Sequence, residues 1–70
     1  METIKLLSVV ALLEDIPSHH LVRGEIGTVV EALEPGVCEV EFSDDAGHTY
    51  ASVAVPIERL IILRNRSQAA

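Results

Sequence analysis

The sequence L-V-R-G-E-I-G-T-V-V at residues 21–30 decides the fold. In it, Gly24 and Gly27 stand just ahead of residues 28–30, whose threonine and two valines favour a β-strand. Because glycine tolerates positive φ and a close approach of neighbouring backbone, we expect a turn at Gly24 and a kink or bulge at Gly27. A strand entered through such a bend, among further short strands at close spacing, is how a small and strongly curved barrel begins.

Five short strands are expected along the chain. They occupy residues 8–13, 26–34, 37–42, 48–55 and 60–63. A long loop at residues 14–25 joins the first two strands, and one 3-10 turn at residues 56–60 precedes the last. No room is left for the helix that an OB-type barrel usually has between its third and fourth strands. The order therefore predicts an all-β chain: a small five-stranded SH3-like barrel at residues 1–63, followed by a polar C-terminal tail at residues 64–70.

The alternation of residue types predicts which face each strand buries. Residues 37–42 read V-C-E-V-E-F, so Glu39 and Glu41 face water and the apolar residues between them face the core. A slip by one residue would bury two glutamates, which fixes the register. In the second strand Glu31 faces water, which places Val30 inside.

The composition limits what the chain can be. Its 70 residues make one small domain, 49% of them hydrophobic, with a formal charge of −6 from 11 acids and 5 bases. This acidity disfavours binding to nucleic-acid phosphate or to an anionic membrane, and no apolar run reaches the ~18 residues of a membrane span. The N-terminus resembles a signal peptide only in that Lys5 precedes an apolar run. Because Glu2 and Glu14 flank that run, we expect a cytoplasmic protein.

Nearly the whole chain, residues 4–63, resembles a family of short bacterial proteins classed as a domain of unknown function. The resemblance rests on four runs: L-x-R-G-x-x-G-T-V-V-E, P-G-V-C-E-V-E-F, G-H-T-Y-A and a closing P-x-x-x-L. It implies an SH3-like barrel and a place in toxin–antitoxin-type protein pairs, and it supplies no activity to carry over. The R-G-x-x-G-T-V run also resembles the KOW element of ribosomal and transcription proteins, whose RNA-binding members are usually basic.

Few residues of the sequence are typical of a catalytic or metal-binding site. His19 and His20 lie in the long loop, which we expect Ile16 and Leu21 to hold under the barrel; with no third ligand, the two histidines indicate a solvated loop rather than a metal site. Cys38 has no basic neighbour in sequence to lower its pKa, which indicates a buried and inert thiol. No glycine-rich phosphate loop or Ser/His/Asp arrangement is recognisable. We therefore expect no catalytic residue, no cofactor and no metal.

Two functions from different classes remain. In the first, the chain is a small acidic protein-interaction module, the neutralising, antitoxin-like member of a two-protein pair, and its acidic face attracts a basic partner. That face comprises Glu31, Glu39, Glu41, Asp44 and Asp45. In the second, the chain is a KOW-like nucleic-acid-binding accessory protein that contacts phosphates through its arginines, which only a clustering of those arginines away from the acids would favour. The arginines are Arg23, Arg59, Arg64 and Arg66.

The apolar residues exceed what one small barrel hides. The first strand is apolar on both faces, and so is the run L-I-I-L at residues 60–63. The first and last strands of an SH3-like barrel are neighbours, so both surpluses should form one exposed patch, which marks an interface. We therefore predict a homo-oligomer, a dimer with Ile61 and Leu63 at the centre of its interface, unless the same patch serves a different protein.

Overall fold

The computed structural model of the chain describes residues 4–64. Its elements follow the expected order, and most bounds agree within two residues with those expected from the sequence. They are β1 (Val9–Leu12), η1 (Pro17–His19), β2 (Ile26–Glu34), β3 (Val37–Ser43), β4 (Thr49–Pro56), η2 (Ile57–Arg59) and β5 (Leu60–Ile62). The 3-10 helix η2 confirms the predicted turn before the last strand, whereas η1, a second 3-10 helix, was not expected. Of the predicted tail at residues 64–70, all but Arg64 lies outside the described residues.

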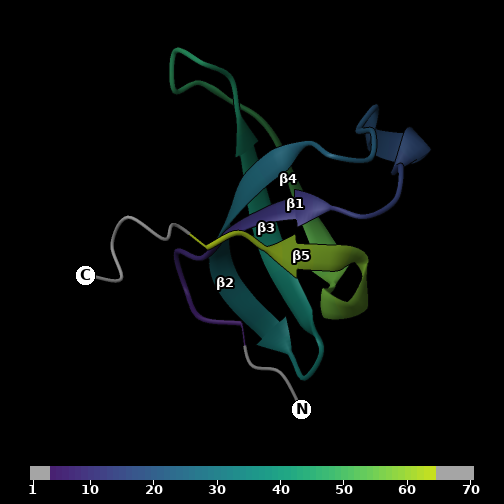
Figure 1. Cartoon of the computed structure of the whole chain (residues 1–70), viewed down its shortest axis with the longest axis vertical. Helices are drawn as coiled ribbons and strands as arrows, with labels where there is room; N and C mark the ends of the chain where they lie inside the picture. Colours follow the sequence, from purple (N-terminus) through teal and green to yellow (C-terminus); the bar gives the residue numbers. More distant parts are fainter. Residues whose placement is uncertain (1–3, 65–70) are drawn as a thin grey trace.

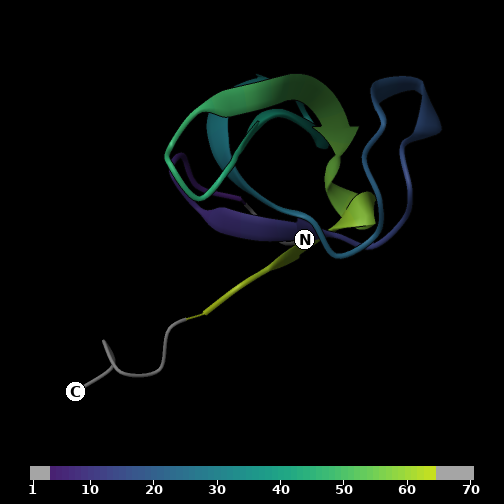
Figure 2. The same ribbon diagram turned by 90° about the horizontal axis from the view of Figure 1, so that it is seen from above.

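All five strands belong to one antiparallel sheet in the order β4-β3-β2-β1-β5. Figure 1 labels the five strands, and the view in Figure 2 shows that the sheet curls so that β1 and β4 lie on opposite sides of an interior. The all-β class, the five strands and the pairing of the first strand with the last are thus confirmed. The predicted closure into a barrel is not found, because β4 and β5 form the two edges and no strand pair among residues 4–64 joins them. β5 has three residues, and all three pair with β1.

The interior of the curl is aliphatic apart from one ring. Phe42, Val40 and Cys38 of β3 point inward and are buried, while Glu39 and Glu41 between them are half-buried on the outer face, so the predicted register of β3 is confirmed. The remaining buried apolar residues are Val10, Leu12, Leu21, Val29, Val53, Val55 and Leu60.

The alternation along β2 changes at Val30. Val29 is 1% exposed and Val30 37% exposed, so the prediction that Val30 faces the interior is wrong. The cause is a β-bulge: Val29 pairs with Val40 and Glu31 with Glu39, which leaves Val30 as an extra residue without a partner on β3. The inserted residue shifts the two-residue period by one, so Glu31 faces outward as predicted, while Val29 and Val30 ahead of it face the opposite sides from those that the pattern assigned.

The two glycines of the opening stretch serve different purposes. Gly24 has φ +93° and its N–H donates to the carbonyl of Leu12 (2.8 Å), which confirms the expected turn. Gly27 lies in a regular part of β2, and the bulge expected there is found instead at Val30 and again between Ala32 and Glu34.

Gly27 is needed for close packing. A Cβ atom at this position would lie 2.6 Å from Cγ1 of Val40, 2.9 Å from Cδ2 of Phe42 and 2.9 Å from the carbonyl oxygen of Glu41. Real Cβ atoms essentially never approach this closely, and one of the three neighbours is backbone. The missing side chain therefore lets β3 and its inward side chains pack directly on β2.

We expect Gly27→Ala to destabilise the fold by about 1–3 kcal/mol, the usual cost of overpacking a filled core. The comparison variant is Gly24→Asn: a side chain at φ +93° strains the backbone, but it overpacks nothing, because no atom lies within 4 Å of a Cβ at Gly24. Urea unfolding of both variants measures the free energies of unfolding. A Gly27→Ala variant as stable as the natural chain would contradict the packing role of Gly27.

Candidate protein-interaction surface

The outer face of the sheet is defined by the pairing of its strands. In β1, Val10 and Leu12 are buried, so Val9 and Ala11 on either side of Val10 point outward. Residues directly opposite each other in an antiparallel pair point to the same side of the sheet. The register of the sheet therefore tells which residues of β2, β3, β4 and β5 share the outer face with Val9 and Ala11.

The apolar strip is the part of the outer face built by β1, β5 and the start of β2. One row across it runs from Ile26 through Ala11 to Ile61, each opposite the next. In a second row, Val9 lies beside Leu63, whose N–H donates to the carbonyl of Val9 (2.9 Å). The large members of the strip are between 40% and 55% exposed. The strip comprises Val9, Ala11, Leu13, Ile26, Ile61 and Leu63.

The acidic strip is the neighbouring part of the outer face, on β2 and β3. It comprises Glu31, Glu39 and Glu41. Glu31 lies directly opposite Glu39, and like charges in this position destabilise a sheet. The hydroxyl of Ser52 donates to Oε2 of Glu39 (2.6 Å), and no strand that the structure describes carries a lysine or arginine. The acidic strip is therefore not neutralised by the sheet that carries it.

The two strips form one continuous surface that meets at β2. Glu41 lies opposite Ser52 on β4 and opposite Thr28 on β2, and Thr28 lies opposite Val9 on β1. A single row of paired residues thus passes from an acid through a threonine to the apolar strip. The sequence predicted Glu31, Glu39, Glu41, Ile61 and Leu63 as binding residues, and the structure brings them onto this one face.

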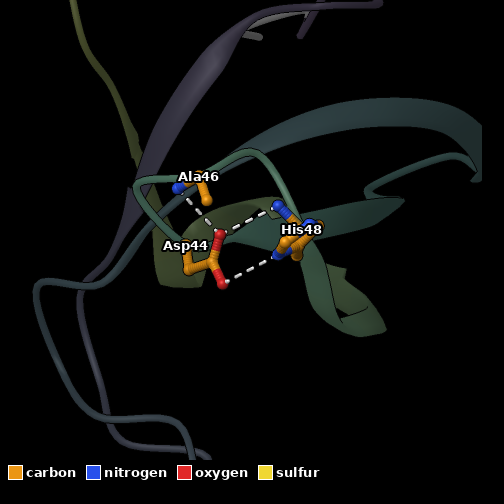
Figure 3. Close-up of polar contacts among 3 residues, drawn as sticks. All are labelled: Asp44, Ala46 and His48. Atoms are coloured by element: carbon orange, nitrogen blue, oxygen red, sulfur yellow. Dashed lines mark hydrogen bonds and ion pairs between the residues drawn. The ribbon is translucent and has the colours of Figure 1, made fainter.

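The two remaining predicted acids lie at the tip of the β3–β4 hairpin. Oδ1 of Asp44 accepts hydrogen bonds from the N–H groups of Ala46 and His48, both at 2.9 Å, and Oδ2 lies 3.6 Å from Nδ1 of His48 (Figure 3). The carboxylate of Asp44 thus shapes its own loop, which leaves Asp45 as the acid of the tip without such a role. Both acids lie beyond the strand residues of the acidic strip.

Contacts among its own residues hold the long loop in place, as expected. Ile16 and Leu21 form an isolated antiparallel bridge, and Leu21 is fully buried. His19 and His20 are exposed, and His20 adopts φ +58° where η1 ends. The geometry of the loop serves its own folding and presents no concentrated charge.

Outside this surface, few side chains that the structure describes could react or bind a metal ion. Burial raises the pKa of the Cys38 thiol, which keeps it protonated, and its Sγ lies 3.8 Å from the carbonyl oxygen of Val55 as a weak donor. Among residues 4–64, no three His, Cys, Asp or Glu side chains gather as ligands for a metal ion. The surface described above is consequently the candidate functional site.

Sequence reasoning did not single out three exposed apolar residues. Ile26 belongs to the apolar strip, yet it was read only as the start of a strand. Leu6 and Leu7 were read as a lead-in, whereas they form an exposed turn in which Leu7 has φ +68° and is hydrogen-bonded to Val29 (2.7 Å). A leucine with positive φ is strained, and no local pattern in the sequence predicts this conformation.

A family model described as "Domain of unknown function (DUF4926)" matches residues 6–62. Neither the comparison with curated proteins nor that with solved structures found a match. Within residues 4–64, the structure has no helix with the length and apolarity that crossing a membrane requires.

One exposed hydrogen bond ties the hairpin to the turn ahead of β2. The hydroxyl of Tyr50 donates to Oε1 of Glu25 (2.6 Å), while Oε2 of Glu25 accepts the N–H of Val22 (2.7 Å). The hydrogen bond to Glu25, more than burial or neighbouring charge, raises the pKa of Tyr50 above its ordinary value of 10.0. The folded chain therefore favours the protonated phenol.

The raised pKa of Tyr50 predicts that the folded chain loses stability at alkaline pH. The contribution of Tyr50 is fully present below its ordinary pKa and disappears as pH rises through the raised pKa of the folded state. We expect the stability difference between the natural chain and Tyr50→Phe to stay constant up to about pH 9 and to shrink above about pH 10. Urea midpoints of both proteins across this range measure it, and a difference that does not change with pH would contradict the coupling.

Proposed function

The chain belongs to the DUF4926 family of domains of unknown function, and we propose that it acts as a small acidic protein-interaction module with no catalysis of its own. Its partner is a basic protein, bound by the outer face of the sheet. The observation that carries this proposal is the continuity of the apolar strip with the acidic strip across β2.

The apolar strip supplies the affinity in this proposal. Its side chains lie side by side on neighbouring strands and stay substantially exposed in the single chain. Contiguous exposed apolar surface in a small protein is typical of an interaction site, because covering it removes that surface from water. A second copy of this chain, centred on Ile61 and Leu63 as predicted from the sequence, is the competing occupant of the same strip.

The acidic strip favours a basic partner over a second copy. A second copy would bring another set of glutamates toward Glu31, Glu39 and Glu41, whereas a basic partner would neutralise them. Cationic side chains would also relieve the repulsion between Glu31 and Glu39, which oppose each other on neighbouring strands. Complementary charge speeds encounter and excludes wrong partners.

An antitoxin-like role is one form of this proposal. A small acidic chain that covers a basic surface of its partner would neutralise whatever that surface does. The proposal places such a pair in the cytoplasm, in keeping with the single unpaired Cys38.

The arrangement of the arginines favours a protein partner over nucleic acid. Nε of Arg59 lies 3.7 Å from Oε1 of Glu14. A basic group of η2 and an acidic group of the long loop are therefore neighbours. Phosphate binding instead needs a basic patch apart from acids. Arg66, the fourth arginine of the KOW-like alternative, lies outside the described residues.

We also propose that the fold is an open relative of the SH3-like barrel. The long first loop, the pairing of β1 with β5 and the single 3-10 turn before β5 support it. The curl of one sheet around a common interior supports it as well (Figure 2).

The test begins with the partner captured by cross-linking in the native host and then purified. Affinity is measured by calorimetry at low and high salt for the natural chain and for Ile61→Lys in the apolar strip. Val22→Lys is the matched control, because Val22 is an exposed apolar residue of the loop, outside both strips. We expect Ile61→Lys to weaken binding about tenfold or more and Val22→Lys to leave it unchanged.

A separate variant tests the contribution of the acidic strip to binding. Glu39→Gln combined with Glu41→Gln should slow association and flatten its dependence on salt, since these carboxylates steer a basic partner. Equal effects of Ile61→Lys and Val22→Lys, or a partner whose binding ignores both salt and the glutamates, would contradict the proposal.

A further inference from the structure

The strand β4 has a free edge. It pairs with β3 on one side, and no other strand among residues 4–64 pairs with it. The opposite edge of the sheet, β5, spans only Leu60–Ile62, whereas β4 spans Thr49–Pro56. A short edge is a poor template for an added strand, and a long one is a good template.

The hydrogen-bond pattern shows which groups of β4 point toward β3. The N–H of Ile57 donates to the carbonyl of Gly36 (2.9 Å), so the pair just beyond the end of β4 is hydrogen-bonded. Hydrogen-bonded and non-hydrogen-bonded pairs alternate along an antiparallel ladder. With the observed register, Val55 opposite Cys38 and Val53 opposite Val40 are therefore the hydrogen-bonded pairs.

The residues between them face the free edge. The N–H and C=O groups of Ser52 and Ala54 point away from β3, and neither residue's backbone makes a hydrogen bond outside the β3–β4 ladder in the described part of the chain. Their side chains are exposed on the outer face. These backbone groups, spaced two residues apart, match what an added antiparallel strand requires.

Devices that usually protect an edge are confined to the two ends of β4. The strand carries no charged side chain, its irregular pairing lies at the start beside Ser43, and its proline, Pro56, is the last residue. Between these ends the edge is regular and uncharged. Natural proteins place lysines, prolines or bulges along an edge that must stay unpaired.

We infer that β4 of a second copy of this chain adds to this edge in antiparallel orientation, across a two-fold axis. The strand is self-complementary in the register that places Ser52 of each copy opposite Ala54 of the other. Val53 then lies opposite its own copy on the axis, and each Ser52–Ala54 pair exchanges both of its hydrogen bonds. The edge-facing N–H and C=O groups of Ser52 and Ala54 all find partners in this register, which is why a second copy fits.

The chain carries a net charge of −6, but none of its acids lies on β4 itself. The nearest strand acids, Glu39 and Glu41, lie on β3. The two β3 strands would be three strand spacings apart, roughly 14 Å, whereas the Debye length at physiological ionic strength is about 8 Å. The apolar strip lies at the far side of the sheet order and stays free, so the dimer would present two partner-binding surfaces.

The test uses the natural chain first. Backbone hydrogen exchange by NMR is followed at low and high protein concentration, with sedimentation equilibrium at both. We expect the 7.6 kDa mass to double with concentration and the amides of Ser52 and Ala54 to become protected as it does. A monomer at both concentrations, or a dimer in which these two amides stay unprotected, would overturn the inference.

Two variants separate this dimer from the proposed partner surface. Ala54→Pro removes an N–H that faces the edge without taking a donor from the β3–β4 ladder, and should leave a folded monomer that still binds the basic partner. Ile61→Lys should lose the partner and keep the dimer. Dissociation of the dimer by Ile61→Lys would overturn the edge pairing. Should Ala54→Pro not fold, the exchange data on the natural chain decide alone.

Discussion

Gly27 is a glycine because β2 and β3 have no room for a side chain between them. Its Cα faces the inward side chains of Val40 and Phe42 and the backbone of Glu41, at distances that exclude a Cβ. Gly27 also pairs with Val10 on β1, so this one close approach lies at the junction of three strands. The sheet curls around the buried ring of Phe42, and the core of this small domain depends on that contact.

A single curled sheet has one interior and a large outer face. The interior takes Val10 and Leu12 from β1, and the outer face takes Val9 and Ala11 from the same strand. A chain of this size has few residues to cover a second apolar face. The excess of apolar residues is therefore displayed on β1, β5 and the start of β2, beside glutamates that no strand residue neutralises. We interpret this arrangement as a binding surface rather than as a defect of packing.

Patterns carried by side chains predicted the fold well, and features of the backbone escaped them. The alternation of acids and apolar residues fixed β3 because burying Glu39 and Glu41 would be costly. It failed at Val30, since a bulge leaves no mark in the sequence and shifts the period by one residue. The role of Gly27 was likewise misassigned, because its cause is the ring of Phe42, fifteen positions later in the chain.

The candidate surface was likewise predicted only in part, because some of its residues are recognisable by type and others join it only through the pairing of the strands. Its acids and the apolar residues of β5 stand out by type, whereas Ile26 joins the surface only through its register with Ala11. Chemical-shift mapping of the labelled chain with its purified partner tests this surface most directly. We predict that the perturbed amides gather on β1, β5 and the outward positions of β2 and β3. Perturbations confined to the 14–25 loop or to the 44–48 hairpin tip would contradict it.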